Sequence, residues 1–104
     1  MVRRGVRAEY EAKKKLGKLF NLNRVWKLAP GQKGPDFVVF KDKKVFFVEV
    51  KSRKGKYTKH THDVDQWDEF KWINKCVAPV EYFLKTSDGW ELMSYEDFGR
   101  IING

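Results

Sequence analysis

The sequence of 104 residues lacks several features that define other classes of protein. It contains a single cysteine, Cys76, so no disulfide can form within the chain, as is usual in a reducing compartment. No apolar run approaches the ~20 residues that a membrane-spanning helix needs. The basic residues at the N-terminus are not followed by the hydrophobic segment of a signal peptide. We therefore expect a cytoplasmic protein that does not contact a membrane.

Internal repeats, linkers and low-complexity tracts are also missing. Hydrophobic residues make up 41% of the chain and aromatic residues 15%, a composition typical of a folded protein and not of a disordered tail. A chain of this length supports one modest hydrophobic core. We expect a single domain over residues 1–104.

Acidic residues are scarce in the first part of the chain. Residues 1–60 contain 18 Lys and Arg but 5 Asp and Glu, which gives +13, whereas residues 61–104 contain 4 and 9, which gives −5. A basic half of this size is typical of proteins that bind nucleic acid. The plainer alternative is a Lys-rich surface that only prevents aggregation. Three of the five acids, Glu9, Asp36 and Glu49, recur below as candidate site residues, and we expect Glu11 and Asp42 to be exposed.

Residues 34–54 carry the strongest strand signal. Residues 37–40 and 45–50 are rich in β-branched and aromatic residues, and the polar run 41–44 separates them. We expect an antiparallel hairpin whose turn is centred between Asp42 and Lys43, so that the numbers of opposed residues add to 85. Both faces of this hairpin are apolar, which favours a sheet covered by helices on both sides.

Charged residues occupy one end of this hairpin. The register places Asp36 opposite Glu49, with Cβ atoms about 5 Å apart, and strand alternation puts Lys51 on the same face as Glu49. Opposed carboxylates repel each other unless a cation lies between them. Because oxygen ligands suit Mg²⁺ or Mn²⁺, we expect a divalent-metal site. The alternative is an exposed strand end held by salt bridges.

The same residues form a known pattern. Asp36, with Pro35 before it and Glu49-Val50-Lys51 after twelve intervening residues, resembles the signature of PD-(D/E)XK nucleases. A preceding helix carries Arg3, Arg4, Gly5, Ala8 and Glu9, and a following helix carries Gln66. In this order and spacing the chain, from Arg3 to about Phe98, resembles the archaeal-type Holliday junction resolvases.

The resemblance implies a restriction-endonuclease-like fold, dependence on Mg²⁺ with Mn²⁺ as a substitute, a homodimer, and a role in DNA recombination and repair. Asp36 and Glu49 would bind the metal together with the backbone carbonyl of Val50. Lys51 would polarise the attacking water. Glu9, as an additional acid and potential ligand, and Gln66, as a supporting residue, would complete the catalytic set.

Two helices are expected to bring Glu9 and Gln66 to this site. Residues 5–20 form an amphipathic helix, and Glu9 falls within its apolar stripe of Ala8, Ala12, Leu16, Leu19 and Phe20. A second helix begins with Asp63 as its N-cap and runs to about Val77. Its core stripe contains Gln66, Phe70, Ile73 and Val77. Trp72 and Val64 lie off this stripe and form a candidate dimer surface.

The remaining segments complete an α/β fold. Residues 22–28 have strand character, residues 80–85 and 89–94 form a second hairpin, and a short helix starts at Tyr95 with Ser94 as its cap. The expected order is α-β-β-β-α-β-β-α, with a central mixed sheet flanked by helices.

Basic residues near the expected site are candidate DNA contacts. They are Arg3, Arg4, Arg7, Lys27, Lys33, Arg53, Lys54, Lys56 and Lys59. A zinc site of His60, His62 and Cys76 is disfavoured, because these residues supply three ligands at a spacing unlike a closed zinc site.

We expect a metal-dependent, structure-specific DNA endonuclease, a resolvase that hydrolyses phosphodiester bonds at four-way junctions. One alternative is another PD-(D/E)XK nuclease, acting on duplex ends, flaps or modified DNA. A rival from a different class is a catalytically idle DNA-binding module that uses the basic half alone.

Overall fold

The computed structural model describes residues 4–28, 34–55 and 61–103, with the backbone alone for residues 4–6. The helices are α1 (Arg4–Phe20), α2 (Thr61–Glu69), α3 (Lys71–Cys76) and α4 (Tyr95–Asn103), and a 3₁₀ turn spans Leu22–Arg24. The strands are β1 (Val25–Lys27), β2 (Phe37–Lys41), β3 (Lys44–Ser52), β4 (Val80–Thr86) and β5 (Gly89–Ser94). None of the described helices is long and apolar enough to cross a membrane.

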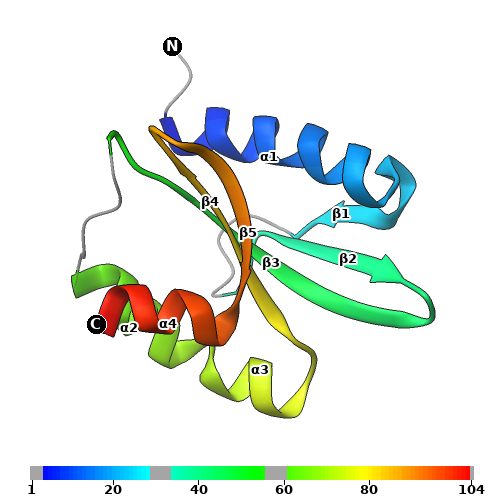
Figure 1. Ribbon diagram of the computed structural model, residues 1–104. Coiled ribbons are helices and arrows are strands. Elements are labelled where there is room, and N and C mark those ends of the chain that lie inside the picture. The colour runs from blue at the N-terminus through cyan, green and yellow to red at the C-terminus, as the bar shows by residue number, and fades with distance from the viewer. Residues whose placement is uncertain (1–3, 29–33, 56–60, 104) are drawn as a thin grey trace.

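The five strands form one mixed sheet in the order β1-β2-β3-β4-β5 (Figure 1). Adjacent strands are antiparallel except β3 and β4, which are parallel because α2 and α3 return the chain between them. Helix α1 covers one face of the sheet, and α2, α3 and α4 lie on the other. The predicted α/β architecture, a central mixed sheet flanked by helices, is therefore confirmed.

The hairpin of β2 and β3 has the predicted register. Phe37 pairs with Val48 and Lys41 with Lys44, so that opposed numbers add to 85. Asp42 and Lys43 form the turn with φ values of 51° and 65°. Positive φ at both central residues is the geometry of a type I′ turn, whose twist matches that of the strands it joins.

Helix α1 packs its apolar stripe on one face of the sheet. The buried residues of this first core are Ala12, Leu16, Val25, Phe37, Val39, Val48 and Phe83. The prediction that Leu19 belongs to the stripe is wrong, because its side chain is 62% exposed. In that last turn the contact with the sheet is made by Phe20, whose ring packs edge-on against Phe46.

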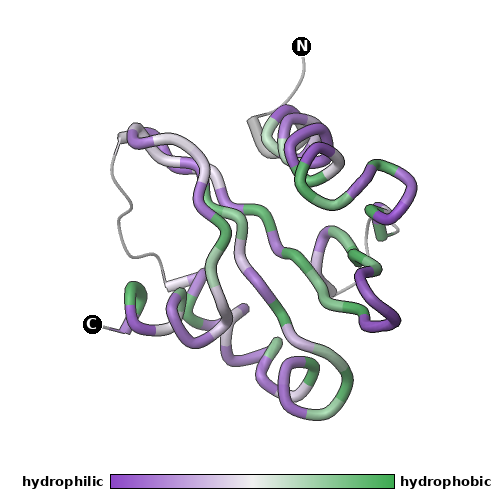
Figure 2. The backbone as a smooth tube through the Cα atoms, turned by 45° about the vertical axis from the view of Figure 1, so that its right-hand side comes forward, coloured by the Kyte–Doolittle hydropathy of each residue, from purple (hydrophilic) through white to green (hydrophobic). Residues whose placement is uncertain are grey.

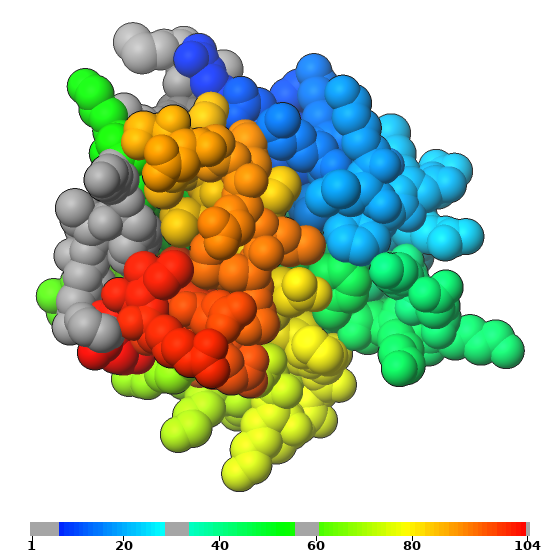
Figure 3. All heavy atoms as spheres, in the orientation of Figure 1, coloured from blue at the N-terminus to red at the C-terminus, as the bar shows by residue number. Residues whose placement is uncertain are grey.

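The opposite face carries the second core. Its buried residues are Phe70, Ile73, Val80, Tyr82, Leu84, Met93, Tyr95, Phe98 and Ile102. The hydropathy-coloured trace shows apolar segments gathered along the strands in the middle of the molecule (Figure 2). In the space-filling view, α4 and β5 cover much of the near face and α1 lies beside them (Figure 3).

The predicted second helix is divided into two. Helix α2 ends at Glu69 and α3 starts at Lys71, with Phe70 between them. Because one continuous stripe does not extend across this break, Val77 is 57% exposed instead of buried. Val64, predicted to lie off the core, packs against the second core, whereas Trp72 is 62% exposed as predicted.

The first strand is shorter than predicted, whereas the second hairpin and the cap of α4 agree with the predictions. The strand expected over residues 22–28 is shortened to β1, because the Asn21 side chain accepts a hydrogen bond from the Asn23 N–H and starts the 3₁₀ turn instead. The second hairpin, β4 and β5, forms as predicted. Ser94 accepts a hydrogen bond from the Asp97 N–H at 3.0 Å and thereby caps α4, which confirms the predicted cap.

Candidate active site

A cavity of about 360 Å³ lies where β3 extends beyond the end of β2. Its lining residues are Ala8, Glu9, Asp36, Glu49, Val50, Lys51, Ser52, Arg53, His62 and Asp63. They come from α1, from the residue before β2, from the end of β3 with the residue after it, and from α2. The structure thus brings four predicted catalytic residues, Glu9, Asp36, Glu49 and Lys51, to one cavity.

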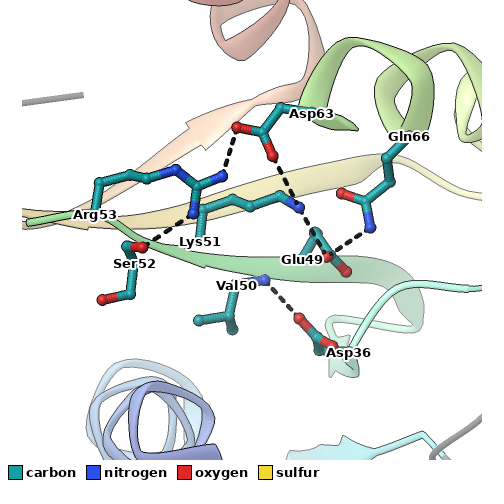
Figure 4. A network of polar contacts seen from close by, with 8 residues as sticks. All are labelled: Asp36, Glu49, Val50, Lys51, Ser52, Arg53, Asp63 and Gln66. Atoms are coloured by element: carbon teal, nitrogen blue, oxygen red, sulfur yellow. Dashed lines mark hydrogen bonds and ion pairs between the residues drawn. The ribbon is translucent and has the colours of Figure 1, made fainter. Parts of the chain in front are cut away.

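Glu49 and Lys51 form a buried ion pair at the end of β3. They are 5% and 7% exposed, and Lys51 Nζ lies 3.5 Å from Glu49 Oε2 (Figure 4). Burial raises the pKa of the Glu49 carboxyl, although the charge of Lys51 opposes this rise. Burying two charges carries a large desolvation cost, so this pair contributes little to the stability of the fold.

Gln66 supports Glu49 from α2. Its Nε2 donates a hydrogen bond to Glu49 Oε2 at 3.0 Å, so the predicted proximity of the two side chains is found. The second carboxylate oxygen, Glu49 Oε1, is buried without a hydrogen-bond partner in the described part of the chain. A buried acceptor without a partner is costly in a folded protein and marks a place where a cation would bind.

The Asp36 side chain binds a backbone amide of β3 that has no partner residue in β2. Its Oδ2 accepts a hydrogen bond from the Val50 N–H at 2.8 Å, an amide beyond the last paired residue of β2. Burial, the charge of Glu49 and a hydrogen bond with Glu9 raise the pKa of Asp36 to about 8. The carboxyl of Asp36 therefore holds a proton at neutral pH in the absence of metal.

Glu9 reaches the cavity from α1, as predicted. Its Oε2 lies 2.8 Å from Lys27 Nζ. Partial burial opposes ionisation of Glu9, but hydrogen bonds from Asp36 and Lys27 outweigh burial and lower its pKa. The two neighbouring carboxyl groups therefore differ in pKa: that of Glu9 is lowered and that of Asp36 is raised.

The residues present fit a small divalent cation. Asp36, Glu49 and the carbonyl of Val50 offer oxygen atoms, and Mg²⁺ commonly uses one or two carboxylates and completes its shell with water. Within the described ranges, no group of three or more His, Cys, Asp and Glu side chains is arranged as a ready-made metal site. Cys76 is exposed and His62 lines the cavity, while His60 lies outside the described residues.

Asp63 is the site residue that sequence reasoning missed. The prediction of Asp63 as an N-cap is wrong, because α2 begins at Thr61 and Asp63 lies in its first turn, 1% exposed. Its Oδ1 is 3.4 Å from Lys51 Nζ and its Oδ2 is 2.5 Å from Arg53 Nη2. The only signal in the sequence is that Asp63 is the first acid after the basic run that ends at Lys59.

The candidate DNA contacts that the structure describes fall into two groups. Arg7 and Lys54 are exposed, whereas Lys27 is paired with Glu9 and Arg53 with Asp63. The remaining candidates, Arg3, Lys33, Lys56 and Lys59 together with the side chain of Arg4, lie outside the described residues.

The sheet and the acid–lysine cluster at the end of β3 define a class, the nucleases of the PD-(D/E)XK type. The chain belongs to the nuclease-related domain family (NERD), whose family model matches residues 4–93. Nucleases of this class generally use divalent metals. No curated protein sequence matches the chain.

A similar fold occurs in Hjc of Archaeoglobus fulgidus, a Holliday junction resolvase from an archaeal hyperthermophile. The TM-score is 0.65 over 90% of this chain and 75% of that chain, with 23% sequence identity. The likeness concerns the fold, and it confirms the predicted restriction-endonuclease-like architecture and the resemblance to archaeal resolvases at that level.

Proposed function

We propose that this protein is a Mg²⁺-dependent DNA endonuclease that hydrolyses phosphodiester bonds at four-way junctions. The observation that carries the proposal is the buried pair of Glu49 and Lys51, which shares one cavity with Asp36. Ion pairs of this kind contribute little to stability after their desolvation cost. The presence of this pair beside Asp36 in one cavity is better explained by chemistry, and the family supports nuclease activity.

Asp36, Glu49 and the carbonyl of Val50 would hold the metal, with Glu9 beside them. The bound ion would polarise the phosphate and lower the pKa of the attacking water. Lys51 would orient this water or stabilise the charge that develops on the phosphate. Gln66 would fix the Glu49 carboxylate through the hydrogen bond to Oε2, so that its other oxygen remains directed into the cavity.

DNA binding is proposed for the basic half of the chain. Its charge of +13 would neutralise several phosphates and release their counterions. Affinity should then fall steeply as salt rises, measured by fluorescence anisotropy with the Glu49→Gln variant. A log–log slope near zero would place the binding surface elsewhere.

Junction resolution requires two cuts, and one chain offers one acidic cluster. We therefore propose a symmetric homodimer, whose two-fold axis would relate two sites at a fixed separation. Trp72 on α3 remains a candidate contact because it is 62% exposed. Light scattering should report about twice 12.3 kDa, and Trp72→Glu should shift the mass toward the monomer. A dimer unaffected by Trp72→Glu would contradict only this choice of interface.

The substrate is tested with labelled four-way junctions, flaps and linear duplexes of matched sequence. Paired cuts at the junction, dependent on Mg²⁺ and absent in Glu49→Gln, are expected. Faster cleavage of flaps or duplex ends would assign the alternative nuclease activity. Tight binding without cleavage of any substrate would identify an idle DNA-binding module, and cleavage in excess chelator would rule out the metal.

A further inference from the structure

Lys51 lies between two carboxylates that come from different elements. Its Nζ is 3.5 Å from Glu49 Oε2 on β3 and 3.4 Å from Asp63 Oδ1 on α2. The side chain of Lys51 is 8% exposed and that of Asp63 is 0% exposed. Helix α2 thus supplies the lysine with a second anionic partner that lies within the same cavity (Figure 4).

Asp63 is itself held by a second cation. Its Oδ2 is 2.5 Å from Arg53 Nη2, and Arg53 Nη1 donates a hydrogen bond to the Ser52 carbonyl at 3.0 Å. Because Arg53 is anchored to the backbone of the neighbouring residue, it fixes the Asp63 carboxylate relative to the end of β3. A buried aspartate with two cationic partners has a fixed orientation.

The two partners of Lys51 would have different roles when a cation binds. Glu49 would donate electron density to a divalent ion bound there, and the nearby Lys51 ammonium would be repelled by the same ion. Asp63 faces the other side of the same ammonium and is available to hold it there. Without Asp63, Lys51 has Glu49 as its remaining carboxylate partner among the contacts described above, and competes with the metal for it.

We propose that Asp63 is a positioning residue that holds the Lys51 ammonium when Glu49 binds the metal, with Arg53 keeping Asp63 in place. The inference rests on the proposed function for its catalytic consequence, but metal binding tests it separately. Residues that orient metal ligands commonly change metal affinity by about 10–100-fold when they are replaced.

The first experiment measures Mn²⁺ binding by electron paramagnetic resonance, which reports the free ion and requires no cleavage. Asp63→Asn should weaken Mn²⁺ binding about tenfold or more. The matched control is Asp65→Asn, which removes the same charge from an exposed position on the same helix and should leave Mn²⁺ affinity unchanged. Equal affinities of Asp63→Asn and the parent protein would overturn the proposal.

A second background shows whether Asp63 acts through Lys51. In Lys51→Met no ammonium competes for Glu49, so adding Asp63→Asn should change Mn²⁺ affinity by less than about threefold, since the coupling of contacting residues is lost. A loss equal to that in the parent background would mean that Asp63 acts by its charge alone, which contradicts the positioning role.

Folding and function are kept apart by two further measurements. If Asp63→Asn does not fold, the double variant Arg53→Met/Asp63→Asn replaces it. This variant removes both members of the Arg53–Asp63 ion pair, which a folded protein tolerates better than one buried charge left without its partner. It should show the same loss of Mn²⁺ affinity. In cleavage assays at saturating Mg²⁺, Asp63→Asn should lower the single-turnover rate and leave DNA affinity unchanged. A parent protein that binds Mn²⁺ but cleaves no DNA would refute the proposed function. The Mn²⁺ affinities of Asp63→Asn and the parent protein would still test the positioning role of Asp63.

Discussion

The middle and the end of β3 belong to one continuous strand but have opposite energetic roles. In its middle, Val48 is fully buried in the first core and Phe47 packs against the second, so both side chains favour folding. At its end, Glu49 and Lys51 are buried to a similar extent as charges, which opposes folding. The difference teaches that burial alone does not identify core residues, because one strand here buries apolar and charged side chains alike.

The strongest test of this comparison is Glu49→Gln. The amide keeps the shape of the side chain but loses the charge that would hold a metal. Cleavage should be abolished, while DNA binding and cooperative thermal unfolding are retained, because Lys51 keeps Asp63 as a partner. Residual cleavage near the parent rate would show that Glu49 is a structural residue like its apolar neighbours.

Lys51→Ala should have the next largest effect. Loss of the ammonium group removes its stabilisation of developing charge, and the single-turnover rate should fall more than ~10²-fold. DNA affinity, measured with Ca²⁺ in place of Mg²⁺, should change little. A weaker affinity with an unchanged rate would reassign Lys51 as a phosphate contact.

The converse substitution is Val48→Ala in the middle of the strand. Removal of two buried methyl groups should lower the free energy of unfolding by about 2 kcal/mol, measured by urea denaturation. Cleavage per folded molecule should remain at the parent level. A loss of cleavage rate without a loss of stability would show that Val48 serves the site and not the core.

A pH dependence of stability is also expected in the metal-free protein. The pKa of Asp36 is raised from 3.8 to about 8, so the folded state keeps a proton that the unfolded state releases. This contribution is complete below about pH 4 and is lost as pH rises to about 8. The melting temperature should therefore decline over this window, and less so in Asp36→Asn. Equal declines in the two proteins would contradict the raised pKa.

The sequence predicts the hairpin of the site well, because register depends on local rules. The turn at Asp42 and Lys43 and strand alternation place Asp36 opposite the end of β3, and both features are short-range. The resemblance to resolvases adds Glu9 and Gln66, which no local rule connects to the hairpin.

What the sequence does not predict depends on long-range contacts. The break at Phe70 separates α2 from α3, and a periodicity calculated for one helix then places Val77 in the core incorrectly. Asp63 looks like an ordinary N-cap residue, and its role as a partner of Lys51 appears only when α2 is packed against the end of β3.

The parallel pairing of β3 with β4 has a consequence for how the protein folds. The hairpin of β2 and β3 joins residues close in the chain, but Glu49 pairs with Tyr82 only after more than thirty residues have crossed over the sheet. Contacts between distant residues form slowly because loop closure must precede them. We therefore expect the carboxylates of Asp36 and Glu49 to meet early during folding, and the enclosure that raises their pKa values to form later. A partly folded chain would carry the acidic residues of a nuclease without its reactivity.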